Sequence, residues 1–325
     1  MLILSRADVE AVLDLRALIE ALARAMADLS AGVTSVPPRI AAMVPEHEGL
    51  LAAMPAYLPS AKALATKLVA VFPRNAAVGL ETHQAVIAVF DTATGVPLAL
   101  MDGAHITAMR TAAGSALATR LLARPAARVL AILGTGVQAR AHARAIPAVR
   151  RVSEVRVAGR DSAKVRRLAE ELAGTLPARA VATYAEALAG ADIVCATTHS
   201  REPVVRREWL SPGVHVNSVG FTEGVEVDAA TVVDAVVVVE SRAAVLAPYP
   251  AGSNDIARPI RDGLITPEHI HAEVGELVSG ARPGRTSPEQ ITLYKSVGIA
   301  VQDAAAAALV LAAARERGLG TEVEL

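Results

Sequence analysis

The first 125 or so residues mix hydrophobic patterns of helical and extended type. Apolar side chains recur at helical spacing from Asp14 to Gly32, and Gly32 is well placed to end that helix. Ser5 and Asp8 are typical of the start of a shorter helix that runs to Leu13. Extended stretches are predicted at 39–44, 67–72 and 85–90, a hairpin turn at 91–97, and a further helix at 106–122.

After Arg128 the pattern changes to short apolar strands that alternate with helices. Strands are predicted at 129–133, 155–158, 193–197, 214–219 and 236–239, and a charged helix at 161–172. Such runs are typical of a parallel sheet covered on both faces. The segment 299–317 predicts one long alanine-rich helix. Because a helix this apolar needs a partner, we expect it to return to the N-terminal part of the chain or to pack on another subunit.

Composition favours an α/β protein and excludes several classes of partner. Hydrophobic residues make up 53% of the 325 residues but aromatic ones only 2%, since much of the total is alanine. A formal charge of -1 and an isoelectric point near 6.7 predict no binding to nucleic acid or to an anionic membrane. The longest uncharged apolar run, 304–314, is too short to cross a bilayer. With no signal-peptide layout and one cysteine, Cys195, the chain is expected to be cytoplasmic.

The strongest local motif follows the strand predicted at 129–133. Residues 134–139 read Gly-Thr-Gly-Val-Gln-Ala, which fits G-x-G-x-x-A between a strand and a helix. Gly134 allows a tight turn, Gly136 lets the backbone approach a pyrophosphate, and Ala139 lets the helix pack on the sheet. The free N–H groups of the helix start favour phosphate. The motif therefore predicts a Rossmann domain that binds a nicotinamide dinucleotide.

The end of the second strand bears on the choice of dinucleotide. Where an NAD enzyme usually places an acid against the ribose, this chain has Gly159 followed by Arg160. A guanidinium without a carboxylate suits a 2′-phosphate, so we favour NADPH, with NADH as the alternative. In that alternative Arg160 is a surface arginine, and Asp161 serves the ribose with a shift of one residue.

Three cationic side chains stand out in the first 125 residues. Arg39 follows two prolines, Lys67 lies within an apolar strand, and Arg110 lies in an apolar helix. A charge in an apolar segment is costly unless it is paired or faces a cleft. Arginine suits bidentate binding of a carboxylate and lysine a point contact with developing charge, although each residue alone is also typical of a surface salt bridge.

Blocks along nearly the whole chain resemble the ornithine cyclodeaminase and mu-crystallin family. The Met-Asp block at 95–102 and the Arg-Thr-Ala-Ala block at 107–113 are far more specific than a Rossmann fingerprint. The other blocks that carry the resemblance are 54–57, Lys67, 134–139, 203–205 with Trp209, 217–220 and 296–303. The resemblance implies a Rossmann domain at 123–298, and an α+β substrate-binding and dimerisation domain at 1–122 and 299–325. It also implies a homodimer formed through the second of these domains.

The resemblance also implies roles for particular residues in a cleft that the nicotinamide faces. Arg39 and Arg110 would hold a substrate carboxylate, Lys67 would contact the carboxylate or the reacting nitrogen, and Met54 would line the pocket. Asp228 resembles the family's acid–base aspartate, although an aspartate at a helix start is usually a cap. The cofactor-binding residues expected from the motif and the resemblance are Thr111, Gly134, Thr135, Gly136, Val137, Gln138, Gly159, Arg160, Ser162, Thr197 and Val219.

The family includes cyclodeaminases, open-chain amino acid dehydrogenases and ketimine reductases. A cyclodeaminase recycles its NAD and has little use for NADPH, so Gly159 and Arg160 favour a net reductase. We therefore expect NADPH-dependent reduction of 1-pyrroline-2-carboxylate or 1-piperideine-2-carboxylate to proline or pipecolate. An ornithine or lysine cyclodeaminase, an alanine or arginine dehydrogenase, and a non-enzymatic NADPH-binding protein of the crystallin type stay open.

Other chemistry has little support in the sequence. The eight histidines do not form a metal-ligand pattern, and no metal is expected. His83 and His105 could reach a cleft, but lone histidines near core strands are more often structural. Cys195, at the end of an apolar strand, is expected to be inert core.

Overall fold

The structure is a computed structural model that describes residues 1–220, 223–248 and 251–324. Contacts divide the chain into two compact units: unit 1 is Met1–Arg110 with Gly298–Leu325, and unit 2 is Thr111–Val297. The division falls inside one helix, whereas the domain bounds expected from the sequence place it after residue 122, where that helix ends.

Unit 1 is built on a seven-stranded sheet, counted over the described residues. The strand order is β15-β1-β6-β5-β4-β3-β2, and every neighbouring pair is antiparallel except β1 and β6. The strands are β1 (Leu2–Leu4), β2 (Ile40–Val44), β3 (Gly49–Leu58), β4 (Ala63–Val71), β5 (His83–Phe90), β6 (Pro97–Asp102) and β15 (Thr321–Glu322).

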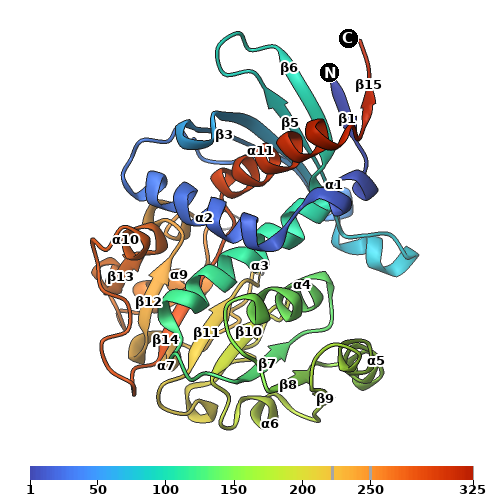
Figure 1. Ribbon diagram of the computed structural model, residues 1–325. Coiled ribbons are helices and arrows are strands. Elements are labelled where there is room, and N and C mark those ends of the chain that lie inside the picture. Colours follow the sequence, from blue (N-terminus) through green and yellow to red (C-terminus); the bar gives the residue numbers. More distant parts are fainter. Residues whose placement is uncertain (221–222, 249–250, 325) are drawn as a thin grey trace. The chain divides into compact units, whose positions relative to one another are not determined.

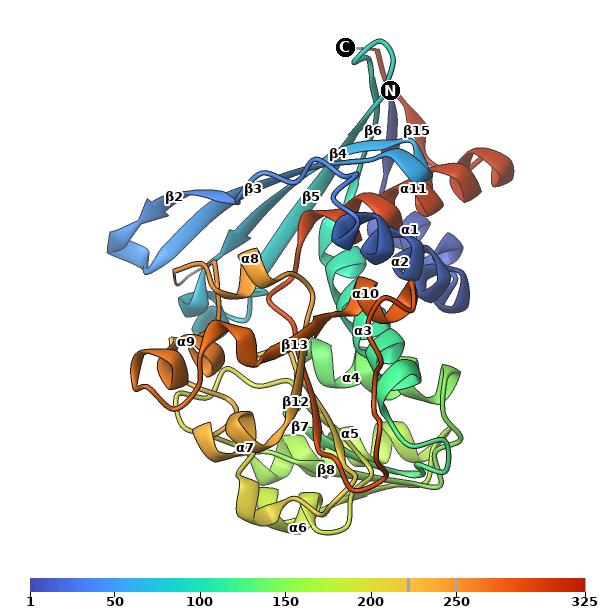
Figure 2. The ribbon, with the colours of Figure 1, turned by 90° about the vertical axis from the view of Figure 1, so that its left-hand side faces the viewer.

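Helices cover one face of this sheet. They are α1 (Arg6–Val12), α2 (Leu15–Ser30) and α11 (Ala300–Arg317), and Figure 2 shows them on one side of the strands. The apolar helix α11 packs on α2, β3, β4 and β5, so the expectation that it returns to the N-terminal part of the chain is confirmed. Ser5 and Asp8 form a capping box at the start of α1, as the sequence predicts, and Asp14 caps α2 through its side chain.

Unit 2 holds an eight-stranded sheet within the described residues, and all of its strand pairs are parallel. The order is β13-β12-β14-β11-β10-β7-β8-β9, so the chain proceeds from β7 in one direction and from β10 in the other. The strands are β7 (Val129–Leu133), β8 (Glu154–Ala158), β9 (Ala178–Ala180), β10 (Ile193–Ala196), β11 (His215–Ser218), β12 (Val236–Val239), β13 (Ile270–Glu273) and β14 (Thr292–Lys295).

The helices of unit 2 lie on both faces of its sheet (Figures 1 and 2). They are the second part of α3 (Gly103–Leu122) with α4 (Val137–Ala145), α5 (Ser162–Ala173), α6 (Tyr184–Leu188), α7 (Ala229–Asp234), α8 (Arg242–Val245), α9 (Asn254–Arg261) and α10 (Val274–Val278). This doubly wound arrangement confirms the α/β fold class with a Rossmann domain. Among the described residues, no helix combines the length and the apolar character needed to span a membrane.

Candidate active site

The glycine-rich loop of unit 2 lies at the switch point of the sheet, between β7 and β10. Gly134 has φ +114°, and a Cβ there would lie 2.7 Å from Oγ1 of Thr197. Thr197 follows β10, and its hydroxyl donates to the carbonyl oxygen of Leu133 at 2.8 Å. Only glycine fits this turn, and the turn lies where open α/β sheets bind their ligands.

The start of α4 offers free hydrogen-bond donors. Gly136 is its N-cap and provides no side-chain cap, and a Cβ added there would meet no other atom within 4 Å. Unbonded N–H groups at an open helix start suit the pyrophosphate of a dinucleotide, so the loop fits the cofactor expected from the sequence.

The end of β8, which bears on the choice of dinucleotide, lies next to the glycine-rich loop. A Cβ on Gly159 would lie 3.4 Å from Cγ2 of Thr135, which brings this position against the glycine-rich loop. Asp161 caps α5, where its Oδ1 accepts from the backbone N–H groups of Ala163 and Lys164. The Arg160 side chain is exposed. The capping bonds of Asp161 weigh against its use on a ribose hydroxyl.

A buried group of charges lies at the carboxyl ends of β11 and β14. The Lys295 ammonium is 2.7 Å from Oδ2 of Asp255 and donates to Oγ of Ser218. The Glu226 carboxylate accepts from the backbone N–H groups of Thr198 and Gly220. The side chains of Lys295, Asp255 and Glu226 are all at most 3% exposed. This buried charge cluster fixes the backbone next to Thr197 and Val219, two of the residues expected to contact the cofactor.

In unit 1 the structure brings Lys67 and Arg110 together around one carboxylate. The ammonium nitrogen of Lys67 lies 2.9 Å from Oδ2 of Asp303, and Nε of Arg110 lies 3.0 Å from Oδ1. Gln302 accepts a further hydrogen bond from Arg110 at 2.8 Å. All three charged side chains are at most 5% exposed. Asp303 lies in the family block at 296–303, but neither its local sequence nor the resemblance predicted a role for it.

Arg39 contacts the backbone beside this group of charges. Its guanidinium donates to the carbonyl oxygen of Gly298 at 2.7 Å. Gly298 has φ +72°, and a Cβ there would lie 2.8 Å from a terminal nitrogen of Arg110. Both expected carboxylate-binding arginines therefore meet at the residue that precedes α11 by two positions, and a side chain at 298 would displace one of them.

The strand register explains which other side chains accompany Lys67. Met54 on β3 and Ile87 on β5 lie directly opposite Lys67, so they share the helix-covered face of the sheet. His83 lies four residues before Ile87 and hence on the same face. Burial lowers the pKa of His83 to about 4, and the positive charges of Lys67 and Arg110 add to the effect. His83 is therefore a neutral neighbour of the cationic group.

Lys67 itself has an altered basicity. Its pKa is lowered to about 8: burial is the main cause, Arg110 and Arg39 also lower it, and the nearby Asp303 carboxylate opposes the shift. A lysine with this pKa can hold or release a proton near neutral pH, which is the property that acid–base chemistry requires.

Asp228 lies at the start of a helix in the structure. It is the N-cap of α7, and its carboxylate accepts from the backbone N–H groups of Thr231 and Arg207. These bonds give it the capping role that an aspartate at a helix start usually has. The acid–base role that the resemblance implies for Asp228 stays a prediction. Residues 221 and 222 of the preceding loop lie outside the described residues.

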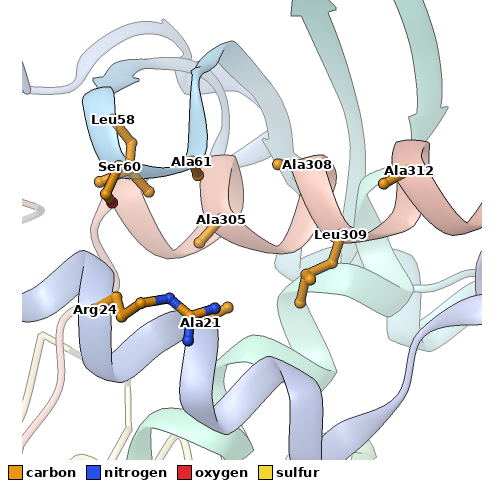
Figure 3. Close-up of a pocket in the computed structure, with 9 residues that line it drawn as sticks. All are labelled: Ala21, Arg24, Leu58, Ser60, Ala61, Ala305, Ala308, Leu309 and Ala312. Atoms are coloured by element: carbon orange, nitrogen blue, oxygen red, sulfur yellow. The ribbon is translucent and has the colours of Figure 1, made fainter.

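The clearest cavity of unit 1 lies elsewhere. Figure 3 shows it between α2, α11 and the turn at 59–61, with a volume of about 220 Å³. Its lining is mainly alanine and leucine, and Arg24 is the one charged residue in that lining. Without convergent polar groups it is a poor site for catalysis. No group of side chains suited to hold a metal ion is found among the described residues.

The sequence also matches a known family. The model of the ornithine cyclodeaminase/mu-crystallin family matches residues 1–318. The chain belongs to this family. The Delta(1)-pyrroline-2-carboxylate reductase of Bacillus cereus (strain ATCC 10987 / NRS 248) is 36% identical over 329 residues, which cover all of both chains. The ketimine reductase mu-crystallin of Mus musculus is 38% identical over 298 residues, 90% of each chain.

Solved structures of the family have the same fold. The Delta(1)-pyrroline-2-carboxylate reductase of Thermococcus litoralis, in complex with NADH and L-proline, superposes with a TM-score of 0.96 and 40% identity. The match covers 99% of this chain and 100% of that one. An archaeal alanine dehydrogenase dimer with bound NAD gives a TM-score of 0.92 and 29% identity over 100% and 99% of the two chains. The resemblance drawn from the sequence blocks is thereby confirmed.

Proposed function

We propose that the chain is an NADPH-dependent reductase of cyclic ketimines. Its substrates would be 1-pyrroline-2-carboxylate and 1-piperideine-2-carboxylate, and its products proline and pipecolate. The pairing of buried Lys67 with buried Arg110 carries the proposal, because it offers a proton and a carboxylate-binding guanidinium in one place. Support comes from relatives across the whole chain that are named as reductases of this class.

The residues of this chain would bind and orient the substrate. Arg110 and Arg39 bind the carboxylate, which fixes the adjacent imine carbon, and orientation of this kind supplies much of the rate. The glycine-rich loop from Gly134 to Gln138, with Thr111, Thr197, Ser162 and Val219, would hold the dinucleotide. When bound, the reduced nicotinamide supplies a hydride, that is, two electrons and one hydrogen nucleus.

Lys67 would supply the proton. As the imine carbon gains the hydride, the ring nitrogen takes a proton from the Lys67 ammonium, and the C=N double bond becomes a single bond. The balance is ketimine, reduced cofactor and one proton giving amino acid and oxidised cofactor. Lys67 regains its proton from solvent, and Met54, directly opposite Lys67, would line the pocket.

The function is tested by following nicotinamide absorbance with purified protein and each of the two ketimines. We expect oxidation of NADPH by at least one of them. Turnover of ornithine to proline with catalytic NAD and no ketimine reduction would instead make the chain a cyclodeaminase. Binding of NADPH without turnover of any imine or amino acid would favour a crystallin-like binding protein.

Arg160 is proposed to select the cofactor. Arg160→Ala is expected to raise the KM for NADPH by about tenfold, the loss of one exposed charge-assisted contact of about 1.4 kcal/mol, and to leave the KM for NADH unchanged. The Thermococcus litoralis relative holds NADH, so both cofactors are compared in steady-state kinetics. Lys164→Ala, on the same helix start, is the matched control. Equal losses with both cofactors would contradict the assignment.

We also propose that the protein is a homodimer formed through unit 1. The sheet face opposite α11 exposes apolar side chains, with Leu51 48%, Val86 40% and Leu68 39% exposed. A continuous apolar sheet face of this kind usually marks an interface. Leu68→Glu is expected to halve the mass measured by light scattering, whereas Leu264→Glu, an exposed leucine of unit 2, should leave it unchanged. A wild-type protein of monomer mass would refute the proposal.

A cytoplasmic location is part of the same proposal. The single cysteine, Cys195, is buried, and burial raises the pKa of its thiol, so it needs no oxidising compartment.

A further inference from the structure

Asp303 lies between the two cations on which the proposed reaction depends. One carboxylate oxygen faces Lys67 and the other faces Arg110, at 2.9 and 3.0 Å. The three residues come from β4, α3 and α11, so the contact exists only in the folded chain. The Asp303 side chain is 2% exposed, which means that its charge interacts with these partners with little screening by water.

Without Asp303, the group formed by Lys67, Arg110 and Arg39 would carry only positive charge. Lys67, Arg110 and Arg39 contribute three positive charges, and His83 is neutral because burial lowers its pKa to about 4. Two buried cations side by side repel each other and lose hydration, and both effects favour loss of the Lys67 proton. Among these residues, the Asp303 carboxylate is the group that raises the pKa of Lys67 and so favours its protonated form.

We propose that Asp303 is a positioning residue of the reductase: its two oxygens hold Lys67 and Arg110 in one arrangement and keep Lys67 an ammonium ion that can supply the proton. This inference rests on the proposed function, in which the proton on Lys67 is transferred to the ring nitrogen of the substrate. The effect of Asp303 on the titration of Lys67 can be measured without any substrate.

The direct test is a titration of Lys67 by nuclear magnetic resonance. The chain has four lysines, Lys62, Lys67, Lys164 and Lys295, so protein labelled with 13C at the lysine ε-carbon gives a simple spectrum. Lys67→Met identifies the signal. In the wild type we expect a midpoint near pH 8, since burial and neighbouring cations lower the pKa to that value.

Asp303→Asn keeps the shape of the side chain and removes its charge. The Lys67 midpoint is expected to fall by about 1–3 pH units, the effect of losing an opposite charge at this distance. The pH profile of kcat/KM for ketimine reduction should shift to lower pH by the same amount, because the free enzyme then loses its proton earlier. A purely structural role would lower activity at every pH without moving the profile.

Two further variants test whether the Lys67 midpoint responds to the charges around it. Arg110→Met removes a cation beside Lys67, so the Lys67 midpoint should rise, the opposite direction from Asp303→Asn. Gln302→Leu removes a neutral partner of Arg110 and should leave the midpoint in place. Should Asp303→Asn fail to fold, the same fall of the Lys67 midpoint is expected in Asp303→Ser, which also removes the charge, and an unchanged midpoint there would overturn the role of Asp303.

The outcomes separate the two proposals. An unchanged Lys67 midpoint in Asp303→Asn would overturn the role of Asp303, even in an enzyme that reduces ketimines. A shifted midpoint in a protein that reduces neither ketimine would support the role of Asp303 in the Lys67 titration and refute the proposed function.

Discussion

Replacing Arg110 by methionine is expected to lower kcat/KM for the preferred ketimine by about a thousandfold, or about 4 kcal/mol. Arg110 is 4% exposed, and its planar guanidinium suits bidentate binding of a carboxylate. Its loss removes a charge-assisted contact and also frees the imine carbon to adopt unproductive orientations. The measurement is steady-state reduction of 1-pyrroline-2-carboxylate and 1-piperideine-2-carboxylate at saturating NADPH.

Two controls show whether this loss is specific. Arg16→Met, on the exposed side of α2, removes an arginine from the same unit and should change neither activity nor melting temperature. NADPH binding to Arg110→Met, followed by fluorescence, should stay close to that of the wild type. A loss of less than tenfold in kcat/KM would mean that the substrate carboxylate binds elsewhere.

The second large effect is expected on stability. Lys295→Met should lower the free energy of unfolding by about 3–5 kcal/mol, because it leaves the Asp255 carboxylate buried without its cation. The measurement is urea unfolding followed by circular dichroism. The exposed Lys164→Met should change the free energy by no more than about 0.5 kcal/mol.

A double variant distinguishes the buried pair from a simple packing defect. Asparagine at position 255 keeps an oxygen for the backbone N–H groups of Glu226 and Val227 but carries no charge. Lys295→Met with Asp255→Asn is therefore expected to regain part of the stability lost in Lys295→Met. Additive losses in the two single variants would contradict the view that the charges are coupled.

Local signals in the sequence predicted those helices and strands whose structure depends mainly on residues close together in the chain. The start signal at Ser5 and Asp8 predicted α1, the apolar repeat from Asp14 to Gly32 predicted α2, and the run of four valines is β12 at the predicted residues. The glycine motif also specified its own turn. In these places the chain's neighbours in sequence are its main partners in space.

Other features depend on contacts between distant parts of the chain. Strand β3 was not predicted, because alanines and Pro55 weaken the β pattern of a strand that pairing with β2 and β4 stabilises. The carboxylate of Asp303 meets Lys67 across 236 positions of sequence, and no local signal reveals such a pair. Asp228 is a different case: its local signal, a helix cap, is confirmed, while the catalytic role implied by the resemblance stays a prediction.

The most direct test of the account is the path of the hydride. The purified protein is given NADPH that carries deuterium at both hydrogens of nicotinamide C4, together with the preferred ketimine, and the amino acid formed is analysed by mass spectrometry and NMR. The account predicts one deuterium per molecule of proline or pipecolate, located at C2. Unlabelled amino acid, or no amino acid while NADPH stays bound, would contradict it.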